Sequence, residues 1–324
     1  MFDLTNSRIL ITGGAGFVGS HITDYLLKEN VSEVILLDNF VRGSKENILE
    51  PLKSKKTRLV EGDIRDINLL DTLLEGIDYC FHMAALRITQ CSENPREAKD
   101  VMINGTYNLI EACRHHKVKK TILASSASIY GQASSFPTSE EHPPYSNYTF
   151  YGAAKMANEL IFRSFYEMYG FQYNAMRYFN IYGPRMDTYG KYTEVLIKWY
   201  HLIKQGKRPV LFGDGEQTMD FVYIEDIAQA NIIAMKADSV DEVYNVGSEV
   251  ETSLKELCDS LLEVMEADIE PEYVSIPIDR KKVEVRRRLA DTKKIKQIGF
   301  RITHSLKDGL KKLVTWLDKT TPKN

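Results

Sequence analysis

The sequence lacks the features of a chain that spans a membrane, is secreted or binds polyanions. No apolar run approaches the ~20 residues that a helix needs to cross a bilayer. Asp3 and Asn6 stand where a secretory signal would be hydrophobic. Lys and Arg total 42 against 45 Asp and Glu, so the formal net charge of -3 leaves no basic excess. We therefore expect neither a membrane nor a nucleic acid as a partner.

Cysteine is scarce and scattered. The four residues are Cys80, Cys91, Cys113 and Cys258, with no Cys-x-x-Cys pair, so neither a zinc site nor a disulfide framework is indicated. A reducing cytoplasm is the simplest location. No further His or carboxylate stands at ligand spacing on an evident shared face with His82, His115 or His116. No metal site is predicted, and we expect His82 in the core and the histidine pair exposed.

The rest of the composition is that of a globular protein. Hydrophobic residues make up 43% and charged residues 27% of the 324 positions, which excludes a disordered or fibrous chain. The length suggests one large domain or two smaller ones. There is no internal repeat and no low-complexity linker.

Short β-branched and apolar runs alternate with helical stretches through the first half of the chain. The predicted strands are residues 8–12, 33–37, 57–61, 79–82 and 120–124. This rhythm is typical of βαβ units and predicts an α/β fold with a doubly wound parallel sheet.

The alternation of strand and helix patterns becomes less regular after about residue 180. Helices are predicted over 195–203, after the N-cap types Thr252 and Ser253, and along 306–317. We expect a cofactor-binding domain over residues 1–180, to which the chain returns around 213–247, and a mainly substrate-binding region over 181–324.

A glycine turn follows the first predicted strand. The spacing of Gly13, Gly16 and Gly19 allows a tight turn, close approach of a pyrophosphate and packing of the next helix. The second strand ends at Asp38 and Asn39, where a carboxylate can hold ribose hydroxyls and repel a 2′-phosphate. Together these features predict a Rossmann-type site for NAD rather than NADP. The alternative is a glycine-rich turn in an ordinary α/β protein.

Other residues at strand ends are less specific. Asp63 could accept a hydrogen bond from an adenine amino group, or it could be a helix N-cap. Ala84 and Ala85 would leave a surface small enough for a cofactor, although paired alanines are common in packed turns.

Tyr151 and Lys155 stand four residues apart in a stretch of helical character, and so on one helix face. The phenol, with an ordinary pKa of ~10, becomes a base when a neighbouring ammonium and a positive nicotinamide stabilise the phenolate. Ser126, at the end of the fifth strand, could hydrogen-bond the same substrate oxygen. The set predicts proton removal from a sugar hydroxyl.

The motif set resembles the extended short-chain dehydrogenases/reductases of the nucleotide-sugar epimerase/dehydratase family, and in particular UDP-glucose and UDP-glucuronate 4-epimerases. The matching segments are 13–19, 38–39, 62–63, 82–85, Asn104, 125–131, 151–155, 177–185 and 213–215. The resemblance implies a Rossmann-type domain that holds NAD permanently and a C-terminal region that closes over a nucleoside-diphosphate sugar. It also implies a homodimer formed through two helices of each subunit.

The resemblance also implies roles for individual residues. The catalytic residues are Ser126, Tyr151 and Lys155. The residues implied for the cofactor are Gly13, Gly16, Phe17, Val18, Gly19, Asp38, Asn39, Gly43, Asp63, Ile64, Ala84, Ala85, Arg87, Asn104, Tyr151, Lys155 and Tyr178. Those implied for the substrate are Arg87, Ser126, Ser128, Tyr151, Asn180, Val210, Phe212, Arg288 and Asp291.

In such enzymes the tyrosine takes the C4 hydroxyl proton while the C4 hydride passes to NAD. The 4-keto sugar then turns, and the hydride returns to its other face.

Dehydratases and decarboxylases of the family carry acidic residues just after the serine or threonine. Ala127 and Ser128 occupy those positions here and are poor proton donors. This favours 4-epimerisation of a UDP-hexose or UDP-hexuronate. The alternatives are a 4,6-dehydratase or decarboxylase, or a non-catalytic NAD-binding regulator.

One position departs from the family pattern. Relatives often carry an arginine where this chain has Met219, and that arginine binds diphosphate. Either Arg288, Lys191 or Arg208 compensates, or the substrate is held differently. The nucleotide base and the sugar stay open.

Overall fold

The computed structural model describes residues 1–188, 194–276 and 285–320. Its centre is a seven-stranded, all-parallel sheet in the order β10-β6-β5-β4-β1-β2-β3. The strands are β1 (Arg8–Thr12), β2 (Glu33–Asp38), β3 (Thr57–Glu61), β4 (Tyr79–His82), β5 (Lys120–Ser126), β6 (Tyr173–Tyr178) and β10 (Glu242–Val246). This is the strand order of a doubly wound Rossmann fold with one strand added. The predicted fold class, a doubly wound parallel sheet, is confirmed.

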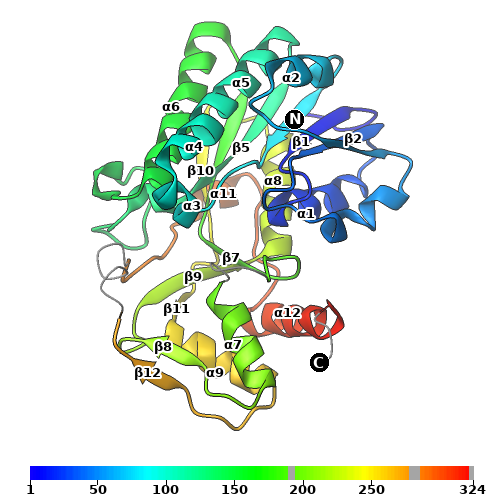
Figure 1. Cartoon of the computed structure of the whole chain (residues 1–324). Coiled ribbons are helices and arrows are strands. Elements are labelled where there is room, and N and C mark those ends of the chain that lie inside the picture. The colour runs from blue at the N-terminus through cyan, green and yellow to red at the C-terminus, as the bar shows by residue number, and fades with distance from the viewer. Residues whose placement is uncertain (189–193, 277–284, 321–324) are drawn as a thin grey trace.

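Helices cover both faces of the sheet (Figure 1). Helices α1 (Phe17–Leu26) and α8 (Ile224–Lys236) share a core with Ile9 and Ile11, whereas Leu10 faces a second core. That second core also includes residues of α2 (Ile67–Leu74), α5 (Thr106–His115) and α6 (Phe150–Tyr169). Alternate strand residues are therefore buried on opposite faces, which is why the strands read as continuous apolar runs.

The connection from β4 to β5 is irregular before α5. It holds α3 (Ile88–Glu93), α4 (Pro95–Lys99) and a π-helical turn over Asp100–Gly105. Helix α6 begins more regularly, because Thr149 caps it by accepting from the Gly152 N–H at 3.1 Å. It ends at Gly170, in the left-handed conformation with φ of 69°.

The smaller region lies beyond the carboxyl ends of the strands (Figure 1). Its strands are β7 (Asn180–Tyr182), β8 (Val210–Phe212), β9 (Thr218–Tyr223), β11 (Glu251–Ser253) and β12 (Glu272–Val274). They form a sheet of order β11-β9-β7 and the pair β12-β8. Its helices are α7 (Val195–Lys204), α9 (Leu254–Val264) and α12 (Leu306–Thr320), and α11 (Lys293–Gln297) contacts β10.

Two details refine the sequence-based expectations. Ser253 is the N-cap of α9 in a reciprocal capping box with Glu256, which confirms that helix start. The return to the main sheet is made by α8 and β10, whereas β8 and β9 stay with the smaller region. No helix within the described ranges is both long and apolar enough to cross a bilayer.

Candidate active site

A cavity of 1320 Å³ lies where the central strands end. Its walls come from the segments after β1, β2, β3 and β4, from the ends of β5 and β6, and from α7 and β8. Ligands of open α/β sheets bind in this crevice outside the carboxyl ends of the strands.

Most of the predicted site residues line this cavity. They are Gly13, Gly16, Phe17, Val18, Gly19, Asp38, Asn39, Gly43, Asp63, Ile64, Ala84, Ala85, Arg87, Ser126, Ser128, Tyr151, Lys155, Tyr178, Asn180, Val210, Phe212 and Arg288. Asn104 and Asp291 do not line it.

The glycine turn requires its glycines. Gly13 has φ of 67°, and a Cβ atom at this position would lie 2.7 Å from the Ala84 backbone nitrogen. A Cβ atom at Gly19 would collide with the Gly13 carbonyl oxygen. The glycines therefore let the turn pack closely on itself and on the segment after β4. The turn leads into the N-terminus of α1, and the positive end of that helix favours an anionic group.

Asp38 is held beside that cradle. Its two carboxylate oxygens accept from the backbone N–H groups of Ala15 and Phe40, each at 2.9 Å. Burial raises the pKa of the Asp38 carboxyl, and the two amide donors oppose this effect. A Cβ atom at Gly43 would lie 2.6 Å from Asp38 Oδ1, so glycine here keeps room beside the carboxylate. These features fit the ribose end of a dinucleotide.

Asp63 is fixed by other side chains. Asn39 Nδ2 donates to it at 2.8 Å, and Arg65 donates to both of its oxygens. The Arg65 hydrogen bonds lower the pKa of the Asp63 carboxyl to about 2. The N-cap of α2 is Asp66, so the helix-capping role considered for Asp63 is wrong.

Ser126, Tyr151 and Lys155 meet on one wall of the cavity. Ser126 ends β5 and lies close enough to Tyr151 that its side chain lowers the pKa of the phenol. Lys155 Nζ lies 5.7 Å from the centre of the Tyr151 ring and donates to the Ala124 carbonyl at 2.6 Å. The groups predicted to act together are therefore neighbours.

The electrostatics of this wall concern the chain without its cofactor. The sequence predicts that the Lys155 ammonium and a positive nicotinamide together favour the Tyr151 phenolate. In the chain itself, burial raises the pKa of Tyr151, against the Ser126 hydrogen bond and the charges of Arg42 and Arg288. Burial also lowers the pKa of Lys155 to about 8. Removal from water penalises both charged forms, and the ammonium is directed to a carbonyl rather than to the phenol.

A buried network fixes this wall from behind. Arg177 of β6 makes a double hydrogen bond with Glu159 of α6, at 3.0 Å from Nε and 2.7 Å from Nη2. Ser125 Oγ donates to the same carboxylate. The network ties the helix that carries Tyr151 and Lys155 to strands β5 and β6.

The wall formed by the smaller region offers polar atoms to a ligand. Asn180 Oδ1 and Arg288 Nε are buried and have no hydrogen-bond partner among the described residues. Arg87 forms an ion pair with Asp187 at 2.7 Å. Buried polar groups cost free energy unless they are hydrogen-bonded, so this wall suits a polar ligand.

Sequence reasoning missed several nitrogen-bearing side chains in the cavity wall. Arg42, Lys198 and His201 line it although none was assigned a role. Arg42 follows Asp38 by four residues, in the loop that leaves the carboxyl end of β2. Lys198 and His201 are three apart on α7, a spacing that puts both on one helix face.

Several expectations are not supported by the positions of the residues. Asn104 is exposed, and its amide donates to Asp100 at 3.0 Å. Asp291 forms an ion pair with Lys293 at 3.2 Å and stays outside the cavity. Arg208 donates to two backbone carbonyls, also away from the cavity. Of the three candidates to replace an arginine at Met219, Arg288 lines the cavity, and Lys191 lies outside the described residues.

His82 is a core residue, as predicted. Its Nδ1 and Nε2 atoms lie 2.7 Å from Thr12 Oγ1 and 2.9 Å from Thr106 Oγ1. Burial lowers the pKa of His82 to about 3, so the ring is neutral at physiological pH.

Comparison with known proteins identifies the family. The NAD dependent epimerase/dehydratase family matches residues 9–247, and the chain belongs to it. UDP-glucose 4-epimerase of Mycolicibacterium smegmatis is 33% identical over 313 residues, which are 95% of this chain and 97% of that protein. UDP-N-acetyl-alpha-D-glucosaminuronate decarboxylase of Bacillus cytotoxicus is 32% identical over 320 residues, 95% and 97% of the two chains.

A solved structure agrees with this assignment. UDP-N-acetylglucosamine 4-epimerase from Methanobrevibacter ruminantium, in complex with UDP-N-acetylmuramic acid, matches with a TM-score of 0.92 at 32% identity. The match covers 98% of this chain and 100% of that one. The predicted family and fold are confirmed, and NAD is the cofactor that the family description names.

Proposed function

We propose that this enzyme is an NAD-dependent 4-epimerase of a nucleoside-diphosphate sugar, with a UDP-hexose or UDP-hexuronate as substrate. The observation that carries the proposal is the meeting of Ser126, Tyr151 and Lys155 on the wall of a cavity that also contains the glycine turn. Two of the relatives named above are 4-epimerases of UDP-sugars, which supports the same reaction.

NAD fits the residues at one end of the cavity. The backbone after Gly13 would hold the pyrophosphate, and Asp38 would accept from the ribose hydroxyls beside Gly43. Bound NAD would supply the acceptor and donor of a hydride at C4 of the sugar.

The chain's own residues would move the C4 proton. We assign Tyr151 as the base that removes it and Ser126 as the donor that orients the C4 oxygen. Lys155 would stabilise the phenolate once the site is occupied. Because the pKa of the Tyr151 phenol is raised in the chain alone, the tyrosine rests protonated and needs added positive charge before it can act as a base.

Residues beside Ser126 favour epimerisation over elimination. Ala127 is buried and carries no proton donor, and Ser128 lines the cavity with a hydroxyl only. The decarboxylase among the relatives is the reason to keep a dehydratase or decarboxylase as the second candidate. Retention of both Tyr151 and Lys155 argues against a non-catalytic regulator.

The remaining assignments follow the same reasoning. Residues 1–180 would hold NAD and residues 181–324 mainly the nucleotide sugar. Asn180, at the boundary, and Arg288 would offer the sugar polar atoms that have no partner among the described residues. A homodimer would cover exposed apolar side chains on α5 and α6, namely Tyr107, Leu160, Met168 and Tyr169. The cytoplasm is the proposed location, supported by four free cysteines.

The test is to incubate the purified protein with UDP-, GDP- and dTDP-sugars, including UDP-glucose, UDP-glucuronate and their N-acetyl counterparts. Products are identified by mass and proton NMR. A product of unchanged mass with an inverted C4 coupling is expected. Loss of water or carbon dioxide would contradict the role given to Ala127 and Ser128, and the absence of any product would contradict the substrate class.

A further inference from the structure

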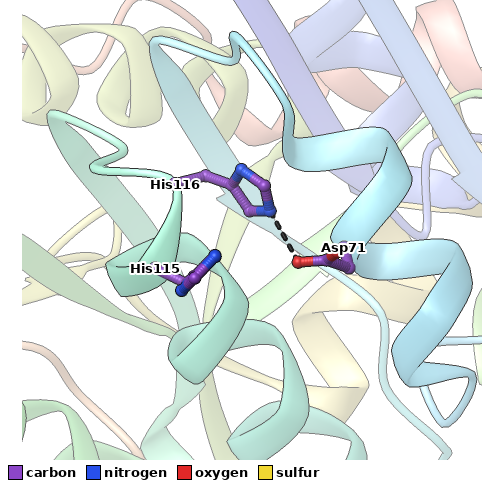
Figure 2. Close-up of side chains that lie close together, drawn as sticks. All are labelled: Asp71, His115 and His116. Carbon is purple, nitrogen blue, oxygen red and sulfur yellow. Dashed lines mark hydrogen bonds and ion pairs between the residues drawn. The ribbon is translucent and has the colours of Figure 1, made fainter.

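Two histidines and an aspartate lie close together (Figure 2), and none of them lines the cavity. Asp71 comes from α2, His115 is the last residue of α5, and His116 follows it. One potential ligand atom from each side chain lies within 4.8 Å of the other two. His116 Nε2 is 2.7 Å from Asp71 Oδ1.

The fold presents these side chains to one another. Helices α2 and α5 pack together on one face of the sheet, with Leu70 and Leu109 in their shared core. Asp71 and His115 are exposed, and His116 is half-buried. The two imidazole rings stand edge to face with their centres 4.9 Å apart, on the side of α5 that faces α2 (Figure 2).

Electrostatics at this point favour a cation. The pair lies at the C-terminus of α5, which carries the negative end of the helix dipole. Asp71 adds a formal negative charge. Two cations flank the pair in the sequence. Arg114 lies 4.8 Å over the ring of Tyr169 on α6, and Lys117, the residue after His116, is exposed to solvent.

We propose that Asp71, His115 and His116 bind one divalent transition-metal ion of the zinc class. Imidazole nitrogen and carboxylate oxygen are ligands that Zn²⁺ prefers, and two histidines with one carboxylate form a known three-ligand set completed by water. Ligand distances of about 2.0–2.2 Å put ligand atoms roughly 3.3 Å apart in a tetrahedral site. The His116–Asp71 pair opens slightly and the exposed His115 ring turns inward to reach that spacing.

The bound ion bridges α2 and α5. Because the folded chain holds the three ligands together and the unfolded chain does not, binding should raise the thermal stability. None of the three residues lines the active-site cavity, so the metal takes no part in the proposed hydride and proton transfers.

The experiment is a titration of the full-length, tag-free protein with Zn²⁺ at pH 7.5, where unperturbed histidine is mostly neutral. Calorimetry should give one ion per chain, and the melting temperature in Zn²⁺ should exceed that in EDTA. Asp71→Asn and His115→Ala should each weaken binding at least about tenfold, equivalent to 1.4 kcal/mol. Glu75→Gln, which changes an exposed acid just after α2, should bind as the wild type does.

Further readouts separate this site from other effects. Because Asp71 and His115 are exposed, both variants should melt in EDTA at the wild-type temperature. Visible absorption of bound Co²⁺ should be lost in the same variants. Epimerase turnover should be equal in Zn²⁺ and EDTA, so failure of the metal site would leave the proposed function standing. The proposal would be overturned if the protein did not bind Zn²⁺ at about 0.1 mM. It would also be overturned if Asp71→Asn and His115→Ala both bound Zn²⁺ as tightly as the wild type.

Discussion

Replacing Glu159 by glutamine is expected to destabilise the fold by removing one charge of a buried ion pair. Both carboxylate oxygens of Glu159 accept from Arg177, and the two side chains are only 5% and 7% exposed. Glu159→Gln keeps the shape of the side chain but leaves the guanidinium without its carboxylate partner. It also weakens the hydrogen bond from Ser125, the residue before Ser126.

The magnitude follows from the burial of the pair. Removing one partner of a buried ion pair costs roughly 3–5 kcal/mol, since an uncompensated charge stays in the interior. Unfolding entropy of about 2.1 cal/mol/K per residue, over a chain of 324 residues, gives roughly 0.7 kcal/mol/K. The melting temperature should therefore fall by roughly 4–7 °C if the chain unfolds in one transition.

Differential scanning calorimetry measures this shift, and α6 offers a matched control. Glu167 on the same helix forms an ion pair with Arg163 at 3.6 Å, with side chains 62% and 57% exposed. An exposed helical pair contributes about 0.3–0.5 kcal/mol, so Glu167→Gln should lower the melting temperature by less than about 1 °C. A Glu159→Gln protein that melts no lower than the Glu167→Gln protein would refute the reasoning.

Three further predictions concern catalysis, pH dependence and assembly. Tyr151→Phe should lower turnover by at least about 100-fold without loss of bound NAD. The bound NAD is measured by absorbance after the protein is denatured to release it. Full activity would exclude Tyr151 as the base. Burial lowers the pKa of Lys155 from 10.5 to about 8, so between these values the unfolded chain binds more protons and stability rises with pH. In urea unfolding, the free energy of unfolding should rise less with pH for Lys155→Met than for the wild type. An unchanged dependence on pH would contradict the assignment of this rise to Lys155. Leu160→Glu should give monomers in light scattering, whereas Leu49→Glu, equally exposed at 57% but away from α6, should not; a Leu160→Glu dimer would exclude this interface.

The parts of the site that sequence predicts well are those set by local spacing. Three glycines at intervals of three, directly after an apolar strand, permit the positive φ at Gly13 and the close backbone packing at Gly13 and Gly19. Tyr151 and Lys155 share a helix face because a helix turns once in 3.6 residues. The five predicted strands agree with the structure within two residues, and β5 extends far enough to bring Ser126 to its end.

Asn104 shows where a residue role implied by the resemblance fails. It lies in a π-helical turn, Asp100–Gly105, which holds more residues per turn than an α-helix and therefore changes the face on which later residues lie. Asn104 is left in solvent, whereas Met102 is buried and its sulfur accepts from the Leu86 N–H beside the cavity. No periodicity in the sequence predicts this change in the helix face on which the residues lie.

Predicting the cluster of Asp71, His115 and His116 requires a non-local property, which is the order of the strands in the sheet. Helical periodicity places Asp71 and His115 on exposed faces but does not say that their helices are neighbours. In the observed order, the chain reverses direction across the sheet after β3, so the crossovers from β3 to β4 and from β4 to β5 run the same way. Right-handed crossovers then put α2 and α5 on the same face, next to the strand that they share. The contact between residues 71 and 116 is thus a consequence of topology, and any chain with this strand order brings the same two helix surfaces together.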